Sequence, residues 1–257
     1  MRRIRVIPVL LLHAGDLVKT RRFRDRVYIG DPINAVRIFN EKGVDELILL
    51  DITDKRVEST DQERFLADIV GEAFMPIACG GGVTNVRQVE RILKLGVEKI
   101  VINSAAIANP SLISEIARQF GSQSVVISID ARRGFSGRYR VYKEGAREAT
   151  KLDPVLHAKQ MENAGAGEIL ITSVDREGTF RGYDTDLIRA IADAVQVPVI
   201  ACGGASGVND FVTAVGVGRA SAVAASSMFV FQGKHRAVLI SFPDEALLRK
   251  TLSEQEQ

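Results

Sequence analysis

The chain has 257 residues, 46% of them hydrophobic and 26% charged, with a formal net charge of +2. These values are typical of one soluble α/β domain, and the small net charge argues against nucleic acid or an anionic membrane surface as a partner. Only two cysteines occur, so a disulfide framework is not expected and a reducing, cytoplasmic location fits. The apolar run over residues 6–12 is too short to span a membrane and lacks a cleavage-site pattern.

Short apolar runs alternate with longer amphipathic stretches along the chain. The runs are apolar throughout, as expected for strands buried on both faces of a parallel sheet. The predicted strands, in chain order, cover residues 6–11, 47–51, 77–79, 100–103, 125–130, 169–173, 199–201 and 222–225. The predicted helices cover residues 33–42, 62–72, 86–95, 111–120, 154–164, 186–194, 208–215 and 245–252. Asp31-Pro32 and Asp153-Pro154 supply start signals, and Gly43 and Gly165 supply stop signals.

The second half of the chain repeats the first. Residues 43–50 correspond to residues 165–172, and Asp31-Pro32 corresponds to Asp153-Pro154, each 122 residues later. Eight strands, eight helices and a half-chain repeat predict one closed (β/α)8 TIM barrel over residues 1–257, with half-barrels at about 1–123 and 124–257. An open doubly wound sheet is the alternative, but it does not predict the repeat. In a barrel, the chemistry is expected at the carboxyl ends of the strands.

Two predicted connections on that face are longer than usual. One covers residues 12–31 and the other residues 131–151, with a hairpin expected at residues 138–142. We expect one of them to act as a lid; the alternative is that neither connection has a functional role.

Glycine-rich turns end several strands at positions related by the repeat. Glycine lets backbone N–H groups approach an oxyanion, and a following helix N-terminus favours negative charge. The candidate phosphate-binding residues are Gly81, Gly82, Asn103 and Ser104 in the first half, Gly178 and Thr179 after the sixth strand, and Gly203, Gly204, Ala225 and Ser226 in the second half. The pattern predicts a small-molecule ligand with a phosphate at each end; the alternative is that the glycines only make tight turns.

The main catalytic candidate is Asp130, because an acid at the end of an apolar strand is partly desolvated and suited to proton transfer. It could instead bond to its own loop. Asp51 and Lys19 are possible supporting residues. Pseudo-symmetry places Leu11, which has no proton to donate, opposite Asp130. The three histidines are scattered, so neither a replacement acid nor a metal site is expected from them.

The chain as far as about Phe231 resembles HisF, the cyclase subunit of imidazole glycerol phosphate synthase. The matching segments include Gly30-Asp31-Pro32, Asp45-Glu46-Leu47, Leu50-Asp51-Ile52, Gly80-Gly81-Gly82, Asn109-Pro110-Ser111-Leu112-Ile113, Phe120-Gly121-Ser122-Gln123, Ile129-Asp130-Ala131, Gly165-Ala166-Gly167-Glu168 and Gly182-Tyr183-Asp184. The resemblance implies a (β/α)8 barrel that needs no cofactor and takes ammonia from a glutaminase partner. It also implies a ribonucleotide substrate carrying two phosphates, from which imidazole and aminoimidazole carboxamide products arise.

The resemblance also implies a salt-bridged gate where ammonia enters, on the face opposite the chemistry. Its residues would be Arg5, Glu46, Lys99 and Glu168, which begin strands 1, 2, 4 and 6. A HisH-like glutaminase would dock there as a heterodimer. The alternative is that these are four solvated charges.

Three departures from the family pattern leave the reaction open. Leu11 replaces an aspartate, Glu177 replaces the usual aspartate, and the chain differs after Phe231. Loss of one acid–base group costs roughly 10²–10⁴-fold in rate. The departures resemble a side branch found with surface-polysaccharide genes, in which the barrel would pass ammonia to a sugar amidotransferase for lipopolysaccharide synthesis. The alternatives are an authentic cyclase of histidine biosynthesis, with Asp51, His13 or water replacing the acid, and a non-enzymatic regulator of the glutaminase.

Overall fold

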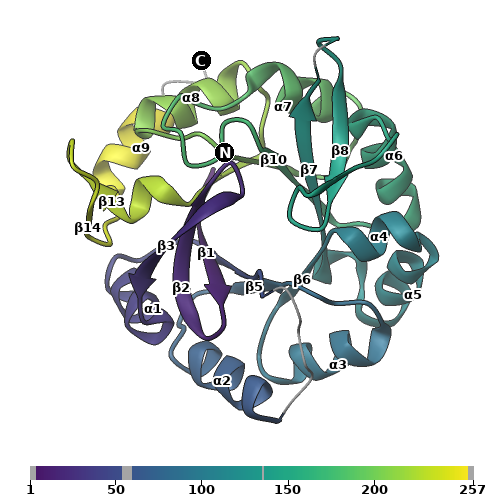
Figure 1. Cartoon of the computed structure of the whole chain (residues 1–257), viewed down its shortest axis with the longest axis horizontal. Helices are drawn as coiled ribbons and strands as arrows, with labels where there is room; N and C mark the ends of the chain where they lie inside the picture. The colour runs from purple at the N-terminus through teal and green to yellow at the C-terminus, as the bar shows by residue number, and fades with distance from the viewer. Residues whose placement is uncertain (1–3, 54–59, 135, 254–257) are drawn as a thin grey trace.

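The computed structural model describes residues 4–53, 60–134 and 136–253. Eight parallel strands close into a barrel surrounded by helices (Figure 1). The sheet closes on itself, because the first barrel strand pairs with the second strand on one side and with the last strand on the other. In spatial order the barrel strands are β1 (Arg5–His13), β4 (Leu47–Asp51), β5 (Ile77–Gly80), β6 (Lys99–Ile102), β7 (Val125–Arg133), β10 (Glu168–Ser173), β11 (Val199–Cys202) and β12 (Ala222–Ala225). The predicted (β/α)8 barrel is confirmed, and the open sheet is wrong.

Strand side chains alternate between the barrel interior and the surrounding helices. A compact interior cluster fills the barrel: Ile7, Val9, Ile48, Ala78, Val101, Val126, Leu170, Ile200, Cys202, Ala222 and Ala224. The intervening residues, such as Leu10 and Leu49, belong to a larger core under the helices. The uniformly apolar strands therefore serve two cores at once, which is why they show no alternation in sequence.

The helices cover the outside of the barrel and begin close to the predicted positions. They are α1 (Pro32–Glu41), α2 (Thr60–Gly71), α3 (Val86–Lys94), α4 (Ser104–Ala108), α5 (Ser111–Phe120), α6 (Pro154–Ala164), α7 (Thr185–Ala192), α8 (Val208–Gly216) and α9 (Glu245–Ser253), with 3-10 turns η1 (Ser122–Ser124) and η2 (Ser227–Phe229). Asp31 and Asp153 cap α1 and α6 by accepting backbone N–H bonds. None of the described helices is long and apolar enough to cross a membrane.

The two long connections form β-hairpins rather than plain loops. After β1, strands β2 (Asp16–Arg21) and β3 (Arg24–Gly30) fold back beside the barrel mouth (Figure 1). After Asp130, β7 continues to Arg133 and pairs with β8 (Tyr139–Lys143), which in turn pairs with β9 (Glu148–Ala149). The predicted hairpin at residues 138–142 is thus mostly strand, because the turn comes earlier, where Gly134 N–H donates to the Arg138 carbonyl.

The chain after β12 forms a separate short hairpin before the last helix. Its strands are β13 (Phe231–Gln232) and β14 (Ala237–Val238), and α9 then packs against α8. The return strand is tied to η2 by bonds from the Leu239 and Ser241 N–H groups to the Val230 and Phe229 carbonyls. This segment therefore packs against the outside of the barrel.

Replacing Phe211 by alanine is expected to lower the free energy of unfolding by about 3–5 kcal/mol. The ring is fully buried and packs between the Tyr183 and Phe229 rings, with centroid distances of 6.4 Å. Urea unfolding measures the change. Phe74→Ala is the matched control, because that ring is 91% exposed, and it should cost less than about 0.5 kcal/mol. Equal losses in the two variants would contradict the assignment of the core.

Candidate active site

Asp130 points into the carboxyl end of the barrel, two residues beyond Ser128 on the interior side of β7. It is 7% exposed. The Asn103 side-chain amide donates to Asp130 Oδ2 at 2.7 Å. Burial raises the pKa of Asp130 to about 7, against the opposing effects of the Asn103 and Ser128 hydrogen bonds. A carboxyl group with that pKa can both donate and accept a proton near neutral pH.

Lys19 reaches the same end of the barrel from β2 and is 2% exposed. Its ammonium donates to the Val9 carbonyl and to Ser226 Oγ, both at 2.6 Å. Burial lowers the pKa of Lys19 to about 8, although the Glu177 carboxylate opposes the shift. Lys19 thus lies between the ends of β1 and β12 and places a positive charge beside a candidate phosphate residue.

Glu177 belongs to this site, although the sequence did not identify it as a site residue. It is 5% exposed, and its carboxylate would lie 3.5 Å from a Cβ placed on Gly203. Burial raises the pKa of Glu177 to about 7, while Lys19 lowers it. The sequence signals were its departure from the family pattern and its place next to the candidate residues Gly178 and Thr179, and neither signal revealed burial beside Lys19.

The β2–β3 hairpin is fastened to the turn that carries Glu177. Arg22 N–H donates to the Glu177 carbonyl at 2.9 Å, and Arg22 Nε donates to the Asp175 carbonyl at 3.1 Å. Gly178 lies so close to Thr20 that an added Cβ would meet its carbonyl oxygen at 2.4 Å. This hairpin, which lies in one of the two connections expected to include a lid, therefore packs against the turn after β10; its movement stays a prediction.

The glycine turns lie at the mouth in two adjacent pairs, as the sequence predicted. The Gly81-Gly82 turn follows β5, beside β6 and Asn103-Ser104, and the Gly203-Gly204 turn follows β11, beside β12. Glycine is required sterically at two of these positions: a Cβ on Gly81 would lie 2.1 Å from the Asp51 carbonyl oxygen, and one on Gly204 would lie 2.2 Å from that of Gly182. Tight backbone packing thus explains these glycines, and phosphate binding stays a prediction.

The hydroxyl groups proposed for phosphate already have partners. Ser104 Oγ accepts from the Glu144 N–H at 3.0 Å, and Ser226 Oγ accepts from Lys19. Thr179 Oγ1 donates to the Arg176 carbonyl at 2.6 Å. Ala225 is buried at the end of β12 and can offer only its backbone. Of these residues, Ser226 has the most favourable setting for an anion, because the ammonium of Lys19 lies beside it.

Four charged side chains form a closed ring at the opposite end of the barrel, which we call the charge ring. Arg5 contacts Glu46 at 2.5 Å and Glu168 at 2.8 Å, and Lys99 contacts the same two carboxylates at 2.9 and 3.2 Å. The Glu46 side chain is 3% exposed and that of Arg5 is 26% exposed. The four charges are therefore linked in one alternating, neutral network rather than separately solvated.

The charge ring lies on the interior side of the strands. Arg5 is in phase with Ile7 and Val9 on β1, and Lys99 is in phase with Val101 on β6. Glu168 is in phase with Leu170, and Glu46 precedes Ile48 by two residues. Because side chains repeat with period two along a strand, all four project toward the barrel axis. The ring thus closes the amino end of the same interior that Asp130 faces at the carboxyl end.

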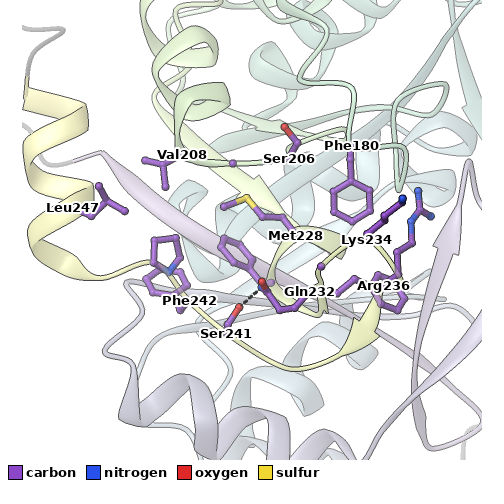
Figure 2. Close-up of a pocket in the computed structure, with 15 residues that line it drawn as sticks. Phe180, Ser206, Val208, Met228, Gln232, Lys234, Arg236, Ser241, Phe242 and Leu247 are labelled. Atoms are coloured by element: carbon purple, nitrogen blue, oxygen red, sulfur yellow. Dashed lines mark hydrogen bonds between the residues drawn. The ribbon is translucent and has the colours of Figure 1, made fainter.

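A pocket of about 560 Å³ lies outside the mouth, between η2, the β13–β14 hairpin and α9 (Figure 2). Phe180, Met228 and Phe242 form part of its wall, and Lys234 and Arg236 project beside Phe180. It contains none of the predicted site residues. Within the described ranges, no three His, Cys, Asp or Glu side chains are grouped for a metal ion, and both cysteines are buried and not joined in a disulfide.

Comparisons with known proteins identify the family. The model of the histidine biosynthesis protein family matches residues 5–235. One relative is the imidazole glycerol phosphate synthase subunit hisF2 of Pseudomonas aeruginosa, whose name marks the assignment as provisional. It is 52% identical to this chain over 244 residues, which cover 95% of this chain and 97% of that protein. The imidazole glycerol phosphate synthase subunit HisF of Alkaliphilus metalliredigens is 46% identical over 230 residues, covering 88% and 89%. The chain is a member of the HisF family.

A second provisionally named relative, subunit hisF3 of Vibrio vulnificus, is 41% identical over 253 residues, covering 98% of this chain and 97% of that protein. Within this HisF-family barrel, Leu11 and Leu50 pack against the interior cluster at the mouth, on the half opposite Asp130. The interior there is apolar at Leu11 and Leu50, whereas Asp130 and Glu177 from the second half, together with Lys19 from β2, are buried ionisable groups.

Neither residue considered as a replacement acid faces Leu11 from a suitable position. Asp51 follows the interior-facing Leu50 by one residue, so it projects away from the axis, and its Oδ1 accepts from the Thr53 N–H at 3.0 Å. His13 Nε2 lies 2.7 Å from Arg26 Nη1 in an exposed pair on the hairpin. Glu177 is the better-placed carboxyl group of this HisF-family site.

Asp130→Asn should change how stability depends on pH. Because the folded pKa of Asp130 is raised to about 7, the folded protein binds a proton that the unfolded chain releases above about pH 4. Stability contributed by the neutral Asp130 is present at low pH and is lost as pH rises through about 7. The free energy of unfolding should be measured with urea at pH 5 and at pH 8 for both proteins. From pH 5 to pH 8, the value for the variant should rise by at least about 1 kcal/mol relative to that of the wild type. Parallel pH curves for the two proteins would contradict a buried, neutral Asp130.

Proposed function

We propose that this chain is the synthase subunit of an ammonia-using complex, and that a HisH-like glutaminase releases ammonia at the amino end of the barrel. The observation that carries the proposal is the charge ring. Its four side chains close the barrel interior where ammonia would enter, and each cation bridges both carboxylates. Displacing one ring member would open the interior without separating the strands. The relatives are named as subunits of imidazole glycerol phosphate synthase, which supports a multi-subunit setting.

The barrel interior is suited to the passage of an uncharged molecule. Apolar side chains line it between the charge ring and Leu11, and three of them are the small residues Ala78, Ala222 and Ala224. Moving an ion through such a medium is costly, whereas an uncharged molecule avoids most of that cost. Ammonia, unlike ammonium, would therefore cross the interior once the ring opens.

The acceptor in this proposal is a sugar in lipopolysaccharide or O-antigen synthesis, reached through a sugar amidotransferase. Leu11 supports it, because among the described residues no carboxyl group faces the interior on the half opposite Asp130, while the charge ring is complete. A barrel that only delivers ammonia needs the ring but does not need two opposed acids.

An authentic cyclase of histidine biosynthesis is the second candidate. One observation favours it: Lys19, Asp130 and Glu177 form a buried ionisable cluster with pKa values shifted to about 8, 7 and 7. Such clusters are common at sites of proton transfer. The two candidates thus differ in whether ammonia reacts inside this barrel or leaves it.

Lys99→Ala should uncouple glutamine hydrolysis from ammonia use. Removing this cation breaks two of the four bridges and leaves Glu46 and Glu168 held by Arg5 alone. In the complex with glutaminase and sugar amidotransferase, the ratio of glutamine-supported to ammonium-supported amidation should fall about tenfold, corresponding to ~1.4 kcal/mol. Lys94→Ala is the control, because Lys94 is exposed and pairs only with Glu90 among the described residues. An unchanged ratio in Lys99→Ala would argue against entry at the ring.

Complementation separates the two candidate acceptors. A histidine auxotroph lacking HisF should not be rescued by this chain, because Leu11 supplies no proton opposite Asp130. Growth without histidine is the measurement, with a HisF that carries aspartate at the matching position as the positive control. Vigorous rescue would instead establish the cyclase; purified chain, ammonia and the bisphosphorylated ribonucleotide should then turn over, with roughly 10²–10⁴-fold loss in Asp130→Asn.

A further inference from the structure

The pocket beside η2 has chemically different ends. Val208 and Leu247 line one end, and Phe180, Lys234 and Arg236 line the other, with Met228 between them (Figure 2). The guanidinium of Arg236 lies 5.0 Å from the centre of the Phe180 ring. A ligand that fills the pocket would therefore need an apolar body and an anionic group at one end.

The cationic end carries two positive charges that are not neutralised by an ion pair within the described ranges. Lys234 and Arg236 are exposed, and neither forms an ion pair with another residue in the described ranges. At the α8 end, Asp210 contributes a carboxylate that accepts from Ser206 N–H and Ser206 Oγ, both at 2.7 Å. That carboxylate disfavours an anion near α8, so the anionic group belongs at the hairpin end.

The apolar part of the pocket offers flat surfaces. The Phe242 ring packs on Phe229 with centroids 5.2 Å apart, and the thioether of Met228 projects between Phe242 and Phe180 (Figure 2). Aromatic and thioether side chains bind planar heterocycles by stacking. Gln232 donates to Ser241 Oγ at 2.6 Å, which leaves its carbonyl oxygen and its second N–H to read polar edges of such a ring.

We propose that this pocket binds a nucleoside diphosphate, with its base among Met228, Phe242 and Gln232 and its phosphates at Lys234 and Arg236. The volume of about 560 Å³ lies within the range of small-molecule sites. The pocket is concave, and its aromatic and cationic parts adjoin, which favours a compact ligand over an extended acidic peptide.

The position of the pocket connects it to the barrel mouth. Phe180 directly follows Thr179, and Met228 lies two residues beyond Ser226, whose hydroxyl contacts Lys19. A group attached to the terminal phosphate would extend from the hairpin end toward the mouth. The ammonia acceptor would then be a sugar carried on a nucleoside diphosphate; this last step rests on the proposed function, whereas the binding itself does not.

Isothermal titration calorimetry on the full chain tests the pocket with uridine and adenosine diphosphates, and with uridine and inorganic pyrophosphate as separate halves. One nucleoside diphosphate should bind at least about tenfold more tightly than either half. Arg236→Ala and Lys234→Ala should each weaken binding about tenfold, because each removes a phosphate contact. Arg249→Ala is the matched control, since Arg249 is exposed on α9, pairs with Glu245 and does not line the pocket.

Three results would overturn the inference. They are no binding of either nucleotide up to about 5 mM, pyrophosphate binding as tightly as the nucleotides, and nucleotide binding unaffected by Arg236→Ala, which would place the ligand in the mouth. Binding of hexaglutamate that depends on Arg236, without nucleotide binding, would instead assign the pocket to an acidic partner protein. Because the titration needs neither glutaminase nor ammonia, its failure would leave the proposed ammonia transfer standing.

Discussion

Closure of the sheet between β1 and β12 is the constraint on which the rest of the structure depends. Once the strands form a closed ring, every second side chain must face the axis. That requirement places Arg5 and Leu11 on the same interior surface at opposite ends of β1. It does the same for Lys99, which begins β6, and Asn103, which directly follows that strand. A small change in strand register would move the charge ring and the mouth residues outward together, so closure and function are linked.

The two ends of the barrel carry their charged groups in different arrangements. At the amino end, the charge ring takes Arg5, Glu46 and Lys99 from the first half and Glu168 from the second, so its salt bridges link the two halves. At the carboxyl end, the first half presents Leu11 and Leu50, whereas the second half presents Asp130 and Glu177 beside Lys19. The charge ring is thus neutral overall, whereas the buried carboxyl groups of the mouth come from one half, and both features fit the proposed delivery of ammonia without two-acid chemistry.

Much of the fold could be read from the sequence, because its signals are local. Apolar runs fixed the eight barrel strands, and Asp-Pro pairs fixed the starts of α1 and α6. The β2–β3 hairpin was not foreseen, since its residues are rich in arginine and its turn contains no glycine. The site was harder: burial of Lys19 and Glu177 depends on the hairpin contacting the turn after β10, a tertiary contact that no local pattern encodes. Resemblance to the family, rather than periodicity, singled out the charge-ring residues.

Isotope dilution tests the central claim most directly. The proposed complex of this chain with a HisH-like glutaminase and a sugar amidotransferase is supplied with amide-¹⁵N glutamine and an excess of unlabelled ammonium, and the amidated sugar is analysed by mass spectrometry. If ammonia enters through the charge ring and stays within the barrel, the product should carry ¹⁵N almost undiluted. Product whose label matches the bulk ammonium pool would show that ammonia travels through solvent, and it would contradict the account.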